Sequence, residues 1–578
     1  MRRFYKTGFR NRNIRKITNV RGKDRRYSEY HETKAAKTTE TQRYSYHSTG
    51  KKGSSESSIL SQKHKRAPRS GDILSIIKDH GLNKEFPLPV EAEASKVRKT
   101  VTKQDLKKRA DLRAENIFTI DGADAKDFDD AVSIKRTEDG NYRLGVHIAD
   151  VSHYVEEDSG IDREALKRGT SIYLIDQVAP MLPLALSNGI CSLNPGEDRL
   201  TLTLDMLVSP DGVTLTHELF ESVINSKARL IYTDVSDLLE KSGTSIRIPA
   251  TIHEDLFIME ELAEILQKKR LRRGSIDFEL DEAEIELDEF GFAINVKKAE
   301  RRVANRIIEE FMLLANETIA EAYHKEDEPF IYRVHEKPDG DKLMHFKTFL
   351  DGLGIRISRR DKGMLPSDFA GILKKVKNGP FEKAVNTVML RTMQKACYDS
   401  ECKGHFGLSV KYYCHFTSPI RRYPDLIIHR IIKECMRGRP SGKRRRDLFA
   451  RTAEAAALSS ETERKALELE REVEKVKKAE YMSRHIGETY EGLISGVLSF
   501  GFFVELPNTV EGLVSVNSLW DDYYIFEAES FRLTGELTKR SFSIGDAVCV
   551  AVESVDIEKH EIDFRLVEYA SVIENVRK

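Results

Sequence analysis

Residues 119–131 read Thr-Ile-Asp-Gly-Ala-Asp-Ala-Lys-Asp-Phe-Asp-Asp-Ala, and the rest of the chain is organised around this stretch. Five aspartates fall within ten residues. The run before them, residues 116–120, is rich in the β-branched and aromatic residues that favour a strand. The pattern therefore predicts a strand that leads into a loop carrying the carboxylates.

Crowded carboxylates are unfavourable without a cation, because like charges a few ångströms apart raise one another's pKa. Magnesium prefers oxygen ligands, keeps several waters and bridges to substrate phosphates. Two such ions roughly 4 Å apart can stabilise both the attacking and the leaving oxygen of a phosphodiester displacement. A solvated acidic loop is the alternative. A calcium loop of the EF-hand type is excluded, because the loop glycine and the closing glutamate are misplaced.

The same stretch resembles the signature T-I-D-G-x-D-A-x-D-F-D-D-A of the ribonuclease II and ribonuclease R family of 3′→5′ exoribonucleases. The resemblance implies a metal site with Mg²⁺, or Mn²⁺ as the alternative, and makes Asp129 a catalytic residue. Asp124 matches a motif position to which we assign no ligand role. The metal ligands implied by the match are Asp121, Asp127, Asp129 and Asp130.

A second stretch, residues 415–425, reads His-Phe-Thr-Ser-Pro-Ile-Arg-Arg-Tyr-Pro-Asp and matches the family pattern H-F-T-S-P-I-R-R-Y-x-D. A guanidinium offers a rigid fork of donors suited to phosphate oxygens. By the match, Arg421 is the catalytic arginine that holds the scissile phosphate. Arg422 either contacts the RNA backbone or pairs with an acid such as Asp425.

Four aromatic residues are candidates for stacking on RNA bases. Tyr173 ends the family-like run Arg-Gly-Thr-Ser-Ile-Tyr at residues 168–173, and a ring at this point can hold any base. Without the match, a tyrosine in a strand-like run is more often a core residue. Phe278 is a second candidate in the same domain, and Phe500 and Phe503 are candidates in the C-terminal module, where Phe502 should face the core.

The chain has 578 residues, long enough for several domains, and equal numbers of basic and acidic residues. Residues 1–70 nevertheless hold 20 Lys and Arg against 5 Asp and Glu, and the remainder holds 74 against 89. The six cysteines form no metal-binding pair, which favours reduced thiols. No run of 18 apolar residues and no secretory signal is present, so we expect a cytoplasmic protein without a membrane span.

The expected fold class is α+β, with a mixed α/β ribonuclease II-type catalytic domain at 116–482 and an all-β OB-fold RNA-binding barrel at 483–570. We expect a basic, disordered tail at 1–70, a linker and remnant of a cold-shock domain at 71–115, and a short tail at 571–578. Relatives of this family carry cold-shock domains before the catalytic domain. Their absence here suggests a truncation or a reading-frame change upstream.

Three further elements can be placed. Residues 142–151 read as a strand, on which His147 and Asp150 match family positions of structural character. Apolar residues recur at helical spacing between 301 and 322, and either Glu309 or Glu310 on this helix matches a position near the active site. Residues 451–482 are charged, have high helix propensity and should close the catalytic domain.

The resemblance implies a processive 3′→5′ hydrolytic exoribonuclease that releases nucleoside 5′-monophosphates from single-stranded and structured RNA by two-metal-ion catalysis. Its partners would be single-stranded RNA and RNA with a 3′ overhang, and we expect a monomer that binds no membrane. Association with a ribosome or a degradosome is left open. The alternatives are a ribonuclease II-like enzyme that stalls at duplexes and a catalytically impaired RNA-binding protein.

Overall fold

The computed structural model describes residues 73–241, 248–278, 281–356, 363–379, 381–528 and 530–568. The two predicted tails, 1–70 and 571–578, lie outside the described residues. All six cysteines are free thiols. Within the described ranges no helix is both long and apolar enough to cross a lipid bilayer.

A five-stranded sheet lies at the centre of the larger part of the chain, with the strand order β1-β8-β7-β4-β3. Neighbouring strands are antiparallel except β1 and β8, which are parallel. On β7, Leu202 and Leu204 on one face and Thr201 and Thr203 on the other are all buried, so both faces of the sheet are covered. Strand β4 confirms the strand predicted at 142–151. The strands are β1 (Ala110–Asp111), β3 (Asp130–Arg136), β4 (Tyr142–Ala149), β7 (Asp198–Val208) and β8 (Thr214–Asn225).

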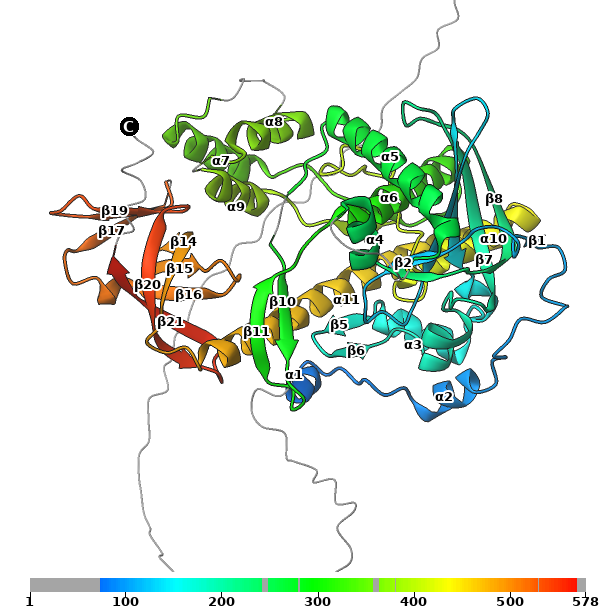
Figure 1. The fold of residues 1–578 in the computed structure, drawn as a ribbon, viewed down its shortest axis with the longest axis horizontal. Coiled ribbons are helices and arrows are strands. Elements are labelled where there is room, and N and C mark those ends of the chain that lie inside the picture. The colour runs from blue at the N-terminus through cyan, green and yellow to red at the C-terminus, as the bar shows by residue number, and fades with distance from the viewer. Residues whose placement is uncertain are drawn as a thin grey trace, which may run out of the picture. The chain divides into compact units, whose positions relative to one another are not determined.

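Helices α5 and α6 pack against β3 and β4, and α10 lies against α11 (Figure 1). The helix predicted between 301 and 322 is α6, and its apolar residues Ile307, Phe311 and Ala315 are buried as the spacing requires. The helices of this part are α3 (Gly160–Arg168), α4 (Tyr232–Leu239), α5 (Ala250–Arg273), α6 (Val303–Lys325), α10 (Tyr423–Arg437) and α11 (Gly442–Met482).

Helix α11 begins at Gly442, nine residues before the predicted start at 451. Two arginines of the basic run at its beginning form ion pairs, Arg444 with Glu157 and Glu434 and Arg445 with Asp327. These pairs depend on distant segments, which the local sequence does not reveal. The helix contacts β5, β13 and, near its C-terminal end, β20 and β21, so it supports both parts of the fold.

Several short elements complete this part. β2 pairs with β9 in parallel, and the remaining pairs are antiparallel hairpins or ladders. Their bounds are β2 (Thr119–Asp121), η1 (Val151–His153), β5 (Ile172–Leu174), β6 (Gln177–Ala179), η2 (Ala185–Ile190), β9 (Arg229–Ile231), β10 (Ala283–Leu287), β11 (Ala293–Lys298), β12 (Tyr332–Val334) and β13 (Cys397–Asp399).

The C-terminal module is a closed barrel with the strand order β14-β15-β16-β21-β20, which confirms the predicted OB-type fold. Phe502 is fully buried and stacks on Phe542 with 4.7 Å between ring centroids, as expected for a core residue. The bounds are β14 (Thr489–Leu498), β15 (Gly501–Glu505), β16 (Glu511–Ser515), η3 (Val516–Ser518), β20 (Ala547–Asp556) and β21 (Glu561–Glu568).

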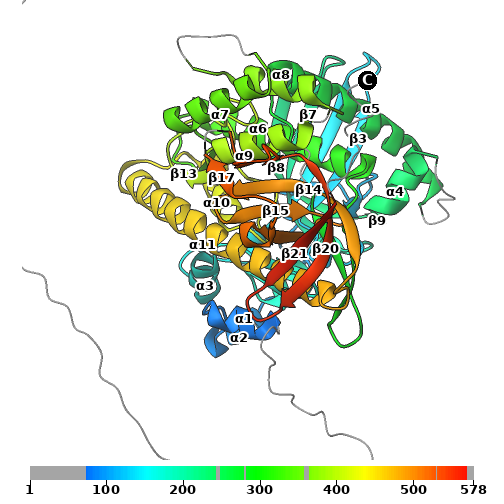
Figure 2. The same cartoon turned by 90° about the vertical axis from the view of Figure 1, so that its left-hand side faces the viewer.

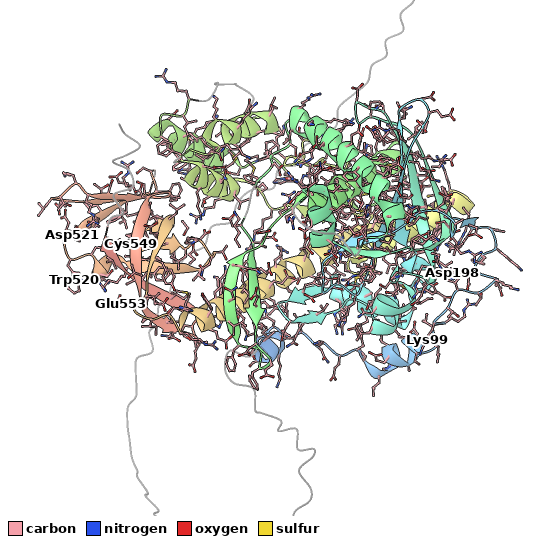
Figure 3. The ribbon with its side chains drawn as sticks, in the orientation of Figure 1. Lys99, Asp198, Trp520, Asp521, Cys549 and Glu553 are labelled. Carbon is pink, nitrogen blue, oxygen red and sulfur yellow. The ribbon has the colours of Figure 1, made fainter. Side chains whose placement is uncertain are left out.

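A small sheet beside the barrel was not expected from the sequence. Its order is β17-β18-β19, with bounds Tyr524–Glu527, Arg532–Gly535 and Ser541–Ser543. Just before it, Trp520 is 91% exposed and lies with Asp521 at the outer edge of the module (Figure 3). Helices α7 (Gly340–Gly352), α8 (Pro366–Val376) and α9 (Glu382–Thr392) lie together (Figure 2), and α9 contacts β14 of the barrel.

The first described residues form two helices, α1 (Ile73–Asp79) and α2 (Leu88–Ala94). Ile73, Ile76 and Ile77 are buried in an apolar cluster with residues of α11, among them Leu469 and Val473. This segment is therefore docked on the body as a helix. Its interpretation as the remnant of a cold-shock domain stays a prediction.

Candidate active site

The aspartates lie in and beside the loop that connects β2 to β3. Asp121 is the last residue of β2 and Asp130 is the first residue of β3. Strand β2 is held by β9, and β3 is held by β4, so both ends of the loop are fixed to the body. The short loop returns the chain to where it left and brings Asp121, Asp127, Asp129 and Asp130 together, as the sequence predicts.

These carboxylates are crowded enough to repel one another. Burial and the neighbouring Asp130 raise the pKa of Asp121 to about 7, and burial raises the pKa of Asp130 to about 6. Burial also holds the pKa of Asp129 well above its usual range, although Arg421 opposes this shift. Raised carboxylate pKa values mean that the ionised forms lack compensation, so the site is short of positive charge.

Asp129 joins this loop to the second sequence signature. Its Oδ1 accepts a hydrogen bond of 2.7 Å from the backbone N–H of Ile420. Its Oδ2 lies 3.3 Å from Nε of Arg421, whose Nη2 donates to Ser418 Oγ at 3.0 Å. The Arg421 side chain is nevertheless 44% exposed. The guanidinium is thus tethered beside the aspartates with part of its donor fork open to a ligand.

Tyr173 contacts the site from β5. Its hydroxyl donates to Asp127 Oδ2 at 2.5 Å, and its backbone N–H donates to Glu470 Oε1 on α11 at 3.2 Å. The residue is 39% exposed, although a hydrophobic core position would bury it. The side chain therefore lies beside the carboxylates and is partly exposed, and its stacking on an RNA base stays a prediction.

The carboxylate set fits a divalent cation of the magnesium type. Asp121 Oδ2 and Asp129 Oδ2 are buried and accept no hydrogen bond from the described residues. No three His, Cys, Asp or Glu side chains in those ranges enclose a metal position by themselves. Mg²⁺ is usually held by one or two carboxylates, with waters and substrate phosphates completing its shell. Two buried carboxylate oxygens without a hydrogen bond, in a site short of positive charge, meet that description.

Comparisons with known proteins identify the family. A family model described as the RNB domain matches residues 109–438, more than half of the chain, and one described as the S1 RNA binding domain matches residues 484–566. Ribonuclease R of Thermotoga maritima is 43% identical over 503 residues, which cover 86% of this chain and 70% of that protein. The chain belongs to the ribonuclease R family.

Two further ribonuclease R proteins show the extent of the likeness. Ribonuclease R 1 of Lactococcus lactis is 45% identical over 85% of this chain, and the chain spans 60% of that protein's length. The solved structure of Mycoplasma genitalium RNase R with ribose-methylated single-stranded RNA matches with a TM-score of 0.81 and 31% identity, covering 86% of this chain and 77% of that one. The same protein has also been solved with double-stranded RNA.

The other residues that the ribonuclease R resemblance selected make no hydrogen bond to the metal-associated aspartates within the described ranges, although the charge of Arg422 opposes the rise that burial causes in the pKa of Asp130. Arg422 forms a bidentate pair with Asp425, with N–O distances of 2.7 and 3.1 Å. Phe278 is partly buried against the apolar cluster that includes the barrel core. On the barrel, Phe500 is 51% exposed and meets the half-buried Phe503 edge to face, with ring centroids 6.4 Å apart. RNA contacts by these four side chains stay predictions.

The two glutamates between which the sequence could not decide both pair with arginines. Glu310 is buried, and its Oε1 lies 2.8 Å from Nη2 of Arg270. Glu309 is on the surface and pairs with Arg301. The structure therefore separates them by burial, Glu310 lying within the body and Glu309 at its surface.

Sequence reasoning missed two residues near the aspartates. Tyr232 begins α4 directly after β9, and its hydroxyl pKa is raised by burial and by the nearby Asp130 and Asp121. Arg229 lies on β9 and donates to backbone carbonyls of the aspartate loop. Both are placed by the parallel pairing of β2 with a strand more than a hundred residues away, for which the local pattern carries no signal.

Proposed function

We propose that this chain is a hydrolytic 3′→5′ exoribonuclease that degrades RNA processively and releases nucleoside 5′-monophosphates with Mg²⁺, or Mn²⁺, as its cofactor. One observation carries the proposal: the hydrogen bond between Asp129 and Ile420 N–H, which joins two signatures 291 residues apart in the sequence. The aspartates and Arg421 then lie at one place, as phosphodiester hydrolysis requires.

The residues have separate roles in this proposal. Asp121, Asp127, Asp129 and Asp130 would hold the cation, which would supply positive charge for attack of water on phosphorus and departure of the 3′ oxygen. Arg421, anchored through Asp129 and Ser418, donates to the scissile phosphate and stabilises the charge that develops on it. The P–O3′ bond breaks, and the shortened strand retains a 3′-hydroxyl.

Binding of RNA is shared between the site and the barrel. Tyr173 stacks on a base beside the scissile phosphate, and a ring in this position accepts every base. Phe500 is exposed on the barrel for the same kind of contact. The RNase R of Mycoplasma genitalium has been solved with single- and double-stranded RNA, which supports extending the proposed substrates to RNA with a 3′ overhang. A monomeric, cytoplasmic enzyme is part of the proposal, and its free thiols suit a reducing compartment.

The test is digestion of a 5′-labelled single-stranded RNA with Mg²⁺, beside the same RNA with a 3′ overhang on a stable duplex and a DNA control. We expect a ladder that shortens from the 3′ end to a short core, on RNA alone. Progress through the duplex would favour the ribonuclease R type of activity, and arrest at the duplex the ribonuclease II type. Retained RNA binding without cleavage would contradict the proposal and indicate an inactive RNA-binding protein.

A further inference from the structure

Arg229 occupies a position on β9 that faces the aspartate loop. In the parallel pair, Thr119 lies opposite Arg229 and Asp121 lies opposite Ile231. Side chains two residues apart on a strand share a face, so Arg229 and Asp121 are on the same side of this pair. Arg229 therefore projects from β9, the strand that pairs with β2, and β2 ends at Asp121.

Its guanidinium holds both ends of the loop. Nη2 donates to the backbone carbonyl of Gly122 at 2.8 Å and to that of Ala123, and these are the two residues that follow Asp121. The guanidinium carbon also lies 5.5 Å from the ring centroid of Phe128, directly before Asp129. One side chain thus spans the loop from its first residues to its last.

The far end of this bridge is itself fixed. The backbone N–H of Phe128 donates to Ser192 Oγ at 3.0 Å, and its carbonyl accepts from Leu193 N–H at 3.0 Å. Arg229 donates no hydrogen bond to Asp121: its Nε and Asp121 Oδ2 are both buried without a hydrogen-bond partner in the described residues. The charge of Arg229 nevertheless opposes the rise that burial causes in the pKa of Asp121, so a variant that keeps this charge isolates the effect of Arg229 on the shape of the loop.

We propose that Arg229 is a positioning residue that sets the separation between Asp121 and the pair Asp129 and Asp130, and thereby the affinity of the site for a divalent cation. This inference rests on the proposed function, since it takes the aspartates as the cation site. Residues that orient ligands from outside the coordination shell change metal affinity by about 10- to 100-fold when replaced.

The decisive variant is Arg229→Lys. Lysine keeps the positive charge near Asp121 but has one compact ammonium in place of a planar fork, so it cannot hold both carbonyls and cover the Phe128 ring. We expect the dissociation constant for Mn²⁺, measured by electron paramagnetic resonance on the full chain without RNA, to rise by about 10-fold or more. RNA affinity in EDTA should stay within about threefold, and added Mg²⁺ should restore the rate of degradation.

Arg445→Lys is the matched control. Arg445 also donates to a backbone carbonyl, that of Asp327, and lies 5.1 Å from the ring centroid of Phe449, but it belongs to the start of α11. Its replacement should leave the affinity for Mn²⁺ unchanged. Circular dichroism and thermal melting in EDTA establish that each variant is folded.

The outcomes separate the two proposals. Equal Mn²⁺ affinities of Arg229→Lys and the unchanged chain would overturn the inference, and so would an equal loss in Arg445→Lys. Unfolding of Arg229→Lys in EDTA would also overturn it, because the role would then be structural. Failure of the unchanged chain to bind Mn²⁺ or to digest RNA would instead contradict the proposed function.

Discussion

Asp129 connects the two sequence signatures, and its two carboxylate oxygens make different contacts. Oδ1 is occupied by the N–H of Ile420, while Oδ2 is buried without a hydrogen bond and faces the charge of Arg421. Replacing the carboxylate by an amide preserves an acceptor for Ile420 but removes the negative charge. Replacing Asp129 by asparagine can therefore separate its hydrogen bond to Ile420 from the effect of its negative charge.

We expect Asp129→Asn to slow RNA cleavage by at least about 100-fold while RNA binding is retained, because a charge that holds the cation is lost and the stacking rings are untouched. Single-turnover degradation and a binding titration in EDTA are the measurements. Asp124→Asn is the control, since Asp124 is exposed on the same loop and has no assigned role. Parallel loss of binding and cleavage would indicate a folding defect instead.

Tyr173 offers a second test, because its ring and its hydroxyl have different contacts. Tyr173→Ala should weaken binding of single-stranded RNA by about 1–3 kcal/mol through loss of stacking. Tyr173→Phe keeps the ring and loses only the bond to Asp127, so it should bind RNA as the unchanged chain does. Fluorescence anisotropy in EDTA measures both. Equal weakening in the two variants would argue against a stacking role.

Asp121 makes the stability of the metal-free protein depend on pH. The pKa of Asp121 is about 7 in the folded state and close to 3.9 in the unfolded state. Between these two pH values the folded state therefore keeps a proton on Asp121 that the unfolded state has lost. The resulting stabilisation is complete below about pH 4 and is lost as pH rises towards 7. Mg²⁺ favours the ionised form, and we expect its stabilising effect to grow over the same interval.

Thermal melting with Mg²⁺ and with EDTA, from pH 5 to pH 8, measures this effect. The comparison with Asp121→Asn isolates the contribution of this residue from those of other titrating groups. The difference between Mg²⁺ and EDTA should increase with pH in the unchanged chain and should be smaller and flatter in the variant. A Mg²⁺ effect that is the same at every pH would refute the expectation.

Ion pairs join the central sheet to helix α10. Asp150 follows β4 and is fully buried, with bonds of 2.6 Å to Arg109 and 2.8 and 2.9 Å to Lys433 on α10. Although burial opposes ionisation, Lys433 and Arg109 hold the pKa of Asp150 well below its usual range. Since α10 follows the segment that carries Arg421, this cluster fixes that segment relative to the sheet.

Asp150→Asn should lower the free energy of unfolding by about 3–5 kcal/mol, because it leaves two buried cations without their full counter-charge. Glu264→Gln is the control, as its pair with Lys268 is exposed and should contribute about 0.3–0.5 kcal/mol. Urea denaturation in EDTA measures both changes. A loss below about 1 kcal/mol at Asp150 would show that the buried pair contributes little to stability.

The barrel and the helices beside it share one apolar cluster, so the chain cannot be divided cleanly after α11. Buried residues of α7 and α9, including Phe349 and Met389, belong to the same cluster as Phe502 and Val497 of the barrel. Lys383 of α9 and Glu505 of β15 add an ion pair of 2.9 Å. Removal of the barrel would expose the partners on the helices to water.

We therefore expect a chain ending at residue 483 to melt at a lower temperature and to bind an apolar dye, since each large apolar side chain left exposed forfeits about 1.5–3 kcal/mol. The double variant Phe500→Ala, Phe503→Ala is the matched control, because it leaves the Phe502 core in place and should weaken RNA binding alone. Unchanged melting and no dye binding in the shortened chain would show that the body folds independently of the barrel.

The OB-type barrel and helix α6 could be predicted from local patterns, because each has an apolar period that matches its structure. The start of α11 and the β17-β18-β19 sheet could not. The first depends on ion pairs with Glu157 and Asp327, and the second has short strands without clear alternation. The metal-associated aspartates and Arg421 were selected by their match to the family's sequence motifs, and the structure brings them together.

The sequence by itself determined which groups are present for chemistry: an unusual density of carboxylates, an arginine in a second signature and aromatic residues for stacking. Tertiary structure alone decided their environment. It forms the hydrogen bond from Ile420 N–H to Asp129 and buries the carboxylates, which raises their pKa values. It also pairs Arg422 with Asp425 and lets Arg229 donate hydrogen bonds to the aspartate loop. Burial and electrostatic coupling depend on contacts between segments far apart in the chain, and no local pattern encodes them.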